Sequence, residues 1–336
     1  MFTVESYPLA VALCVVTMLC WGSWANTQKL ASQEWRFQLF YWDYAFGVLI
    51  LAVVFAFTLG SNGHVGREFR SDLAQADYRW LGSALLSGAI FNLSNILLVA
   101  AIDLAGLAVA FPVGVGLALV LGVVTTYWAT GAGNILMLSA GVAAILVAII
   151  LDAIAYGRLV RTAHQFPVKG LALSIAAGLL MGWFYSFVAA SIGTIDPGSG
   201  HLTPGKLSPY TALVAFSFGL FLSNFVWNTL VMKRPFSGPP VLYRDYFEKG
   251  NVHLHLIGIL GGIIWNLGLG LSLIASAAAG SALSYGLGQG ATLIGAIWGV
   301  FIWKEFRAAP RGTGRVLGAM FAFYLIGLGI LVASKL

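Results

Sequence analysis

Long apolar stretches alternate with short polar ones along the whole chain. Stretches of roughly twenty apolar residues recur between short breaks of charge, proline or glycine, and such a stretch can cross about 30 Å of hydrocarbon as a helix. Because the runs are continuous and do not alternate with polar residues, they predict helices and not the strands of a barrel. Ten membrane helices are predicted, at 7–30, 37–59, 80–102, 106–129, 134–156, 168–190, 209–232, 254–276, 280–303 and 312–334.

The breaks between these helices are too short for a soluble domain, and the longest are 60–79, 191–208 and 233–253. Residues 67–79 combine apolar and acidic positions and predict a short interfacial helix. The expected fold class is all-α, a polytopic membrane protein.

Composition supports this fold class. Of the 336 residues 59% are hydrophobic and only 9% are charged, whereas a soluble domain carries about 25% charged residues. Both cysteines, Cys14 and Cys20, lie in the first apolar run, and their spacing places them on different helix faces. We therefore expect no disulfide, no metal site and no cofactor.

The formal charge of +6 reflects basic residues at helix ends, which is a topology signal and not a nucleic-acid footprint. Loops after the odd-numbered predicted helices hold thirteen Lys and Arg residues, and the other side, which includes both termini, holds five. This asymmetry predicts that both termini lie outside, and we expect a bacterial inner (plasma) membrane. All five histidines fall in predicted loops, which argues against a buried histidine proton relay.

An internal repeat links the two halves of the chain. Residues 88–116 align without a gap on residues 262–290 at an offset of 174, which pairs Asn92 with Asn266 and Phe91 with Trp265. Five helices separate the copies, so they must cross the bilayer in opposite directions, as an inverted repeat. Chance alignment of helices rich in Ala, Gly and Leu is the alternative, but it does not account for matched intramembrane asparagines.

The repeat divides the chain into two predicted units. The first five helices form residues 1–156, a short cytoplasmic connector occupies 157–167, and the second five helices form 168–336.

Four segments carry a family resemblance: Tyr41-Trp42-Asp43-Tyr44, residues 207–212, residues 261–266 and residues 303–307. With these the chain resembles the ureide permease family, which is related to the glucose/ribose and rhamnose porters of the drug/metabolite transporter (DMT) superfamily. The resemblance covers nearly the whole chain. It implies ten helices in two five-helix repeats, and proton-coupled uptake of neutral solutes such as allantoin, uracil and related oxo-heterocycles.

The resemblance has one departure. Plant members carry a long loop with a phosphate-loop-like motif between helices five and six, whereas this chain has only the short connector and no G-x-x-x-x-G-K-[ST] sequence. Nucleotide regulation is therefore not expected. A sugar or nucleoside remains the alternative solute.

Asp43 is the only acidic residue that we place well inside a predicted helix. A carboxylate in a membrane segment is costly and marks a functional site by default, and one that binds and releases a proton suits a symporter. The alternative is a static ion pair with Lys29 across the first two helices.

Asn92 and Asn266, one in each repeat, are predicted to contact the solute, because an amide both donates and accepts hydrogen bonds. Their neighbours Phe91 and Trp265 offer flat rings for stacking, and Asn95 lies one turn from Asn92. The alternative is that the asparagines bond neighbouring helices and touch no ligand.

Further cavity candidates come from polar and aromatic residues that crowd helices one, six and nine. They are Trp24, Asn26, Gln28, Trp183, Tyr185, Tyr285 and Gln289. Several of the aromatic residues are equally typical of interfacial anchors.

Glycines matched between helices four and nine predict a bend at the same level in both copies, although dense helix packing also uses glycine. The bend candidates are Pro112, Gly114, Gly116, Gly286, Gly288 and Gly290. Glu305, beyond helix nine, is expected to form an ion pair or a gate contact.

The sequence thus predicts a secondary active transporter and not an enzyme, working by alternating access on a small neutral polar solute with a proton, as a monomer or homodimer. A channel would need rings of charge, and an exporter of lipophilic cations would need an acid deep in helix one or six. An enzyme would need a cluster of catalytic side chains, and none is visible.

Overall fold

The computed structural model describes residues 1–31, 34–63, 65–105, 107–130, 134–159, 168–196 and 198–334. Most of the connector expected at 157–167 lies outside these residues, as do Gly106, His64 and His164. The long helices are α1 (Tyr7–Ser23) with α2 (Ala25–Ala31), α3 (Phe37–Phe57), α5 (Tyr78–Ala105), α6 (Leu107–Thr130), α7 (Ile135–Leu159), α8 (Val168–Ser191), α9 (Pro209–Lys233), α11 (Val252–Ala279), α12 (Ser281–Gly288) with α13 (Ala291–Ile297), and α14 (Thr313–Ala333).

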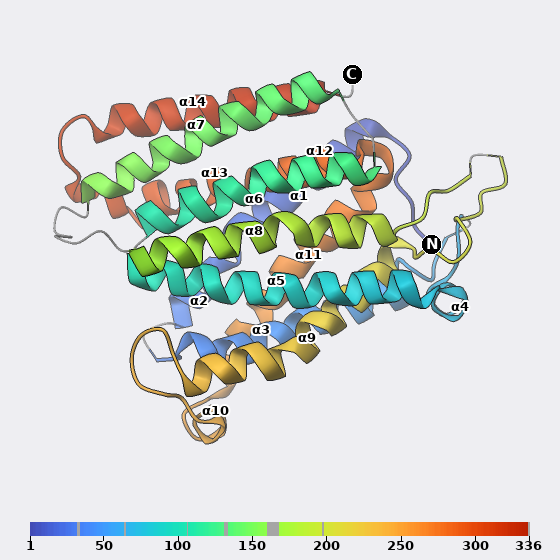
Figure 1. The fold of residues 1–336 in the computed structure, drawn as a ribbon, viewed down its shortest axis with the longest axis horizontal. Helices are drawn as coiled ribbons and strands as arrows, with labels where there is room; N and C mark the ends of the chain where they lie inside the picture. The colour runs from blue at the N-terminus through green and yellow to red at the C-terminus, as the bar shows by residue number, and fades with distance from the viewer. Residues whose placement is uncertain are drawn as a thin grey trace.

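These helices confirm the predicted fold class, and each predicted helix is found within a few residues (Figure 1). Within the described residues nine helical segments are long and apolar enough to cross a membrane, and α6 adds a shorter apolar stretch, Val113–Trp128. The chain is a polytopic integral membrane protein. The short α4 (Phe69–Gln75) is the helix predicted within 67–79, whereas α10 (Tyr243–Glu248) was not predicted.

The N-terminus and the C-terminal end of α14 lie at one end of the helix bundle, which we call the terminal end, and α10 lies at the other, the α10 end (Figure 1). At the terminal end the Arg67 guanidinium donates to Asp72 Oδ1 at 2.9 Å and to the Leu202 carbonyl at 2.8 Å. It also donates to the Thr203 and Lys206 carbonyls. One side chain thereby ties together the two longest loops of this end.

Two helix crossings repeat each other in detail. A Cβ added at Gly88 of α5 would lie 1.9 Å from the Phe216 carbonyl oxygen of α9, and one at Gly262 of α11 would lie 2.0 Å from the Tyr44 carbonyl oxygen of α3. Only glycine permits helices to approach this closely. Gly88 and Gly262 are partners in the 174-residue offset, so the sequence repeat is also a repeat of contacts.

Packing runs across the two halves of the sequence. Helix α5 packs on α8 and α9, and α6 packs on α8, whereas α11 packs on α3 and α1, and α13 packs on α1. The helices therefore form two bundles, α5–α6–α8–α9 and α1–α3–α11–α12/α13, each drawn from both halves. Helices α7 and α14 pack together at one side (Figure 1).

We expected matched bends in helices four and nine, but an interruption of the helix is found in helix nine only. Helix nine is interrupted between α12 and α13, at Gln289 and Gly290. In contrast, α6 is one continuous helix through Pro112, so the first copy has no interruption, and a bend at Pro112 stays a prediction. A membrane helix tolerates proline where its neighbours and local adjustments satisfy the freed backbone groups.

Candidate functional site

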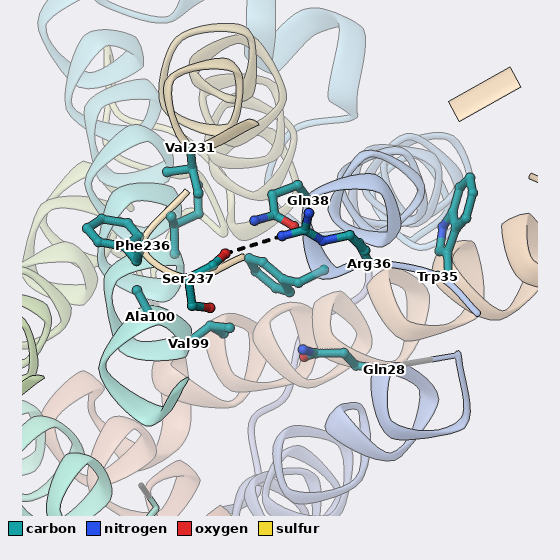
Figure 2. Close-up of a pocket in the computed structure, with 11 residues that line it drawn as sticks. Gln28, Trp35, Arg36, Gln38, Val99, Ala100, Val231, Phe236 and Ser237 are labelled. Carbon is teal, nitrogen blue, oxygen red and sulfur yellow. Dashed lines mark hydrogen bonds between the residues drawn. The ribbon is translucent and has the colours of Figure 1, made fainter. Parts of the chain in front are cut away.

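A cavity of about 220 Å³ lies between the two bundles, and we call it the central cavity. An outer cavity of about 250 Å³ adjoins it at the α10 end, and both are lined by Gln28 and Val99. Figure 2 shows the outer cavity, where Arg36 donates to the Ser237 carbonyl at 3.3 Å. The central cavity is lined by Trp21, Gly22, Trp24, Ala25, Gln28, Phe91, Asn95, Leu98, Val99, Ile102, Val115, Met181, Phe184, Trp265, Gln289, Ala291, Thr292 and Gly295.

Much of this lining comes in equivalent pairs. Phe91 and Trp265 are 174 residues apart, as are Val115 and Gln289. A second offset of 160 residues relates α1 to α8 and pairs Trp21 with Met181 and Trp24 with Phe184. The central cavity therefore lies where the two repeats meet, which is the place expected for a transport site in an inverted repeat.

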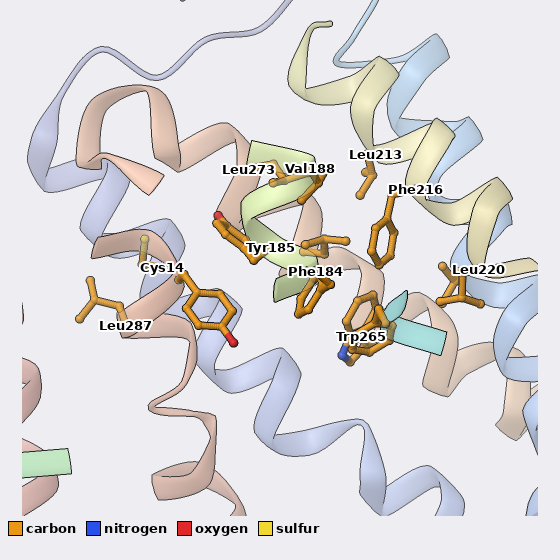
Figure 3. Packing of buried hydrophobic residues seen from close by; sticks show 14 of the residues in the cluster. Cys14, Phe184, Tyr185, Val188, Leu213, Phe216, Leu220, Trp265, Leu273 and Leu287 are labelled. Carbon is orange, nitrogen blue, oxygen red and sulfur yellow. The ribbon is translucent and has the colours of Figure 1, made fainter. Parts of the chain in front are cut away.

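Aromatic rings form one wall of the cavity. Phe91 stacks on Trp265 with ring centroids 4.2 Å apart and planes inclined by 27°. Trp21 is nearly parallel to Trp265, and its indole N–H donates to the Trp265 carbonyl at 3.1 Å. Figure 3 shows Trp265 close to Phe184 and Phe216; the Phe216 ring is nearly parallel to Trp265, whereas the Phe184 ring is tilted against Phe216. Trp21, Phe91 and Trp265 all line the cavity, so this wall is aromatic.

Amides supply the polar part of the lining. Asn95 donates to the Tyr41 hydroxyl at 3.1 Å, which fixes its orientation. Among the described residues no hydrogen bond engages the side-chain amides of Gln28 or Gln289, although Gln289 is only 8% exposed. No described residue of the lining carries a charge. The cavity thus offers hydrogen bonds to a neutral guest.

The predicted candidates divide between this cavity and other places. Trp24, Phe91, Asn95, Trp265 and Gln289 are brought together in the lining, as is Gln28. Among the lining residues that the prediction lacked are Trp21, Phe184 and Thr292.

Asn92 and Asn266 do not line either cavity. Asn92 Nδ2 donates to the Leu220 carbonyl at 3.2 Å, and Asn266 Nδ2 donates to the Val48 carbonyl at 2.7 Å. Each amide also reaches a serine hydroxyl of α9. Both asparagines therefore bond neighbouring helices, which was the alternative reading of the pair.

Two other candidates also lie outside the lining. Asn26 accepts a hydrogen bond from the Trp303 indole at 2.7 Å and donates to the Ser23 carbonyl. Trp183 is 47% exposed on the outer surface of the bundle.

Tyr185 and Tyr285 belong to a buried layer beyond the cavity. The Tyr185 hydroxyl lies 2.8 Å from Ser272 Oγ, and the Tyr285 hydroxyl donates to the Ala118 carbonyl at 3.2 Å. Ser272 in turn lies 2.9 Å from Ser284 Oγ. Helix directions place Ser272 and Ser284 on the terminal-end side of Trp265 and Gln289. This hydrogen-bonded layer separates the cavity from the terminal end.

Two junctions between consecutive helical segments flank the cavity, and at the first, Trp24, the backbone stays helical. The α1/α2 junction falls at Trp24 and the α12/α13 junction at Gln289 and Gly290, and a Cβ added at Gly22 would lie 2.5 Å from the Ala291 carbonyl oxygen. The two interrupted segments thus approach closely where the solute would sit.

The other bend candidates serve packing. A Cβ added at Gly288 would meet the Trp21 ring, and Gly114 lies against Gly178 of α8. Gly116 and Gly286 make looser contacts with leucine side chains. The side chain of Pro112 lies outside the described part of the structure.

Asp43 lies in α3 near the α10 end and is 1% exposed. Its carboxylate accepts a hydrogen bond from the Trp35 indole at 3.3 Å and another from the Tyr246 hydroxyl, and it lies 2.9 and 3.0 Å from His255 Nδ1. Burial and the Asp43 carboxylate raise the pKa of the Tyr246 phenol, so it remains a donor. Three elements therefore converge on this one acid.

The alternative partner for Asp43 and the expected placement of His255 are both wrong. Lys29 does not pair with it, because Lys29 Nζ lies 2.6 Å from Glu305 Oε1, which confirms the ion pair expected for Glu305. His255 is not in a loop but in the first turn of α11, in contact with Asp43. His255 is the second residue of the predicted helix 254–276, so its assignment to a loop was mistaken and this position was the available signal. Asp43, the partner of His255, lies 212 residues away in the sequence.

Comparison with known proteins identifies a family for this chain. The family model described as Ureide permease matches residues 151–334, more than half of the chain. "Ureide permease 1" and "Ureide permease 2" of Arabidopsis thaliana are each 24% identical to it, over 389 and 400 aligned residues, covering 100% of this chain and 99% of each relative.

A solved structure titled "Crystal structure of protein" matches with a TM-score of 0.57 at 16% identity, covering 98% of this chain and 99% of its own, and shows the same fold. The family model covers the helices of the second half of the chain, and the alignments with the two Arabidopsis relatives cover the whole chain. The chain therefore belongs to the ureide permease family.

Proposed function

We propose that the protein is a proton-coupled importer of a small, neutral ureide, nucleobase or related oxo-heterocycle. The observation that carries the proposal is the central cavity, where aromatic rings lie beside the Gln28 and Gln289 amides, which have no hydrogen-bond partner among the described residues. The names of the Arabidopsis relatives point to the same class of solute.

Size and chemistry support this class. About 220 Å³ is below the roughly 300–1,000 Å³ of drug-sized ligand pockets, so the guest is small. A ring with adjacent C=O and N–H groups can stack on Trp265 and exchange hydrogen bonds with Gln289 and Gln28. A charged solute would find no opposite charge among the described lining residues.

Transport would proceed by alternating access. In this conformation the cavity adjoins the outer cavity at the α10 end, while the Tyr185–Ser272 layer and Arg67 close the terminal end. The basic loops favour a cytoplasmic α10 end, with both termini outside a bacterial inner membrane, so this conformation would face inward. Rocking of the two bundles about the cavity would open the opposite end.

Asp43 is the proposed coupling group. Its partners Tyr246 and His255 come from α10 and α11, so protonation of the carboxylate would weaken the contacts that hold α3 to both elements. Proton binding would thus loosen the packing of α3 against α10 and α11 at the α10 end.

The test is uptake into proteoliposomes. Labelled allantoin, uracil, a nucleoside and a hexose are offered with and without an inward proton gradient, and we expect gradient-driven accumulation of allantoin or uracil. Accumulation of the hexose or nucleoside alone would assign the alternative solute. Gradient-independent flux of every solute would refute proton coupling.

The Asp43→Asn variant tests the coupling group. It should lose uphill uptake and retain exchange of solute across the membrane, because the amide cannot cycle a proton. Full accumulation by this variant would exclude Asp43 from coupling. Asp196→Asn, which changes an exposed loop carboxylate in the same way, is the matched control.

A further inference from the structure

A second carboxylate, Asp152, lies inside a membrane-spanning helix. It sits on α7, about two turns before the helix ends at Leu159, and is 8% exposed. Its Oδ1 atom is buried and has no hydrogen-bond partner in the described structure. The predicted helix 134–156 contains Asp152 near its end, but only Asp43 was predicted to be a functional acid.

The ionisable groups around Asp152 do not neutralise it. It interacts electrostatically with Glu305, which carries the same charge, and with the phenols of Tyr156 and Tyr324. Lys29 lies on Glu305, at 2.6 Å, and Arg158 of α7 lies beside Gly312. Within the described residues no cationic side chain reaches salt-bridge distance of Asp152.

Side chains next to Asp152 lie between it and the α10 end on one side, and between it and the central cavity on the other. Tyr156 lies one helical turn further along α7 and donates to Glu305 Oε2 at 2.7 Å, at the α10 end. Tyr324 of α14 lies beside both Asp152 and Thr292, and Thr292 lines the central cavity. Asp152 is therefore placed between the solute site and a surface ion pair.

An ionised carboxylate in this position is strongly disfavoured. It has lost water, faces a like charge, and leaves one oxygen without a donor, and such a group neutralises by taking up a proton. From this geometry we propose that Asp152 binds a proton in the present conformation, as a proton site separate from Asp43. A role of Asp152 in transport rests on the proposed function, but the binding of a proton to Asp152 does not.

Infrared spectroscopy of the purified protein in lipid measures that occupancy without transport. At neutral pH the wild type should show a carbonyl band of a protonated carboxylic acid that shifts in D₂O. Asp152→Asn should remove this band, and Asp196→Asn should leave it unchanged. If the wild-type and Asp152→Asn spectra are identical in this region, Asp152 is ionised and the proposal is wrong.

The wild type alone provides a second test, which does not depend on the variant folding. The band should disappear as the pH is raised, and it should persist when Na⁺ is added at constant pH. Loss of the band on adding Na⁺ would make this a cation site and overturn the proposal. A protein that shows the band but transports no ureide would refute the proposed function and leave the proton site standing.

Discussion

Phe91 and Trp265, which occupy the same position in the two repeats, stack on each other with ring centroids 4.2 Å apart. Equivalent residues can meet in this way only where the two repeats approach their shared axis. The contact therefore places the aromatic wall of the cavity at the centre of the molecule, where both bundles contribute to it. The predictions below start from this wall.

Trp265→Leu should raise the KM for uracil or allantoin about tenfold. Stacking of a flat heterocycle on an aromatic ring contributes about 1–3 kcal/mol, and leucine offers no π-face. Initial rates of uptake into proteoliposomes measure the change. Trp265→Phe should retain most of the affinity, and Trp183→Leu, on the outer surface, should retain all of it. An unchanged KM for Trp265→Leu would remove this residue from the site.

Gln289→Val gives the second repeat the residue that Val115 supplies in the first. The substitution removes the buried amide and should raise KM by about two- to tenfold, since a hydrogen bond to a neutral solute contributes about 0.5–1.5 kcal/mol. Val115→Ala, on the opposite repeat, removes no polar group and serves as the control. Equal effects of the two variants would mean that cavity shape, and not hydrogen bonding, governs affinity.

Asn92→Ala and Asn266→Ala should each lower stability by about 1 kcal/mol and leave KM near the wild-type value. Each amide bonds a backbone carbonyl of a neighbouring helix, and such interhelical bonds contribute about 0.6–2 kcal/mol in membranes. Thermal unfolding in detergent together with uptake kinetics separates the two effects. A raised KM at unchanged stability would return the asparagines to the solute site.

His255→Ala should reduce gradient-driven uptake severalfold, because it removes a partner of Asp43 at 2.9 Å. His253→Ala, two residues earlier and exposed, is the matched control and should behave as wild type. Comparison of accumulation ratios under one proton gradient gives the answer. Equal accumulation by the two variants would show that His255 has no part in coupling.

Tyr246→Phe tests the phenol that donates to Asp43. Burial and Asp43 raise its pKa in the folded state, so its contribution to stability is fully present below the ordinary tyrosine pKa of about 10 and is lost only as the pH rises beyond it. Replacing the phenol should therefore lower thermal stability by the same amount at about pH 6 and about pH 9. A loss confined to one of these pH values would contradict the assignment.

The helices were predictable because an apolar run of about twenty residues is a local property of the sequence. The 174-residue offset went further and identified Phe91 and Trp265 as partners. It could not tell which of two adjacent residues faces the axis, because Phe91 and Asn92 point about 100° apart around α5. The offset gives the depth of a residue in the membrane, and the neighbouring helices decide its face.

Other features depend on distant partners. His255 contacts an acid from α3. Trp21 joins the lining through the packing of α1 on α11 and α13, and Gln28 through that of α2 on α11. Nothing local to those residues specifies these contacts. The break in helix nine was predictable from its glycines, whereas the continuity of α6 through Pro112 depends on its surroundings.

The glycine crossings have a consequence for how the protein is made. Gly88 of α5 packs on α9, and Tyr44 of α3 packs on α11, so helices synthesised first receive their partners only after most of the chain has emerged. During synthesis these faces, including the Asn92 amide, must lie against lipid or against the insertion machinery. Separately expressed halves should then be unstable alone and should recover only when both are present in one membrane.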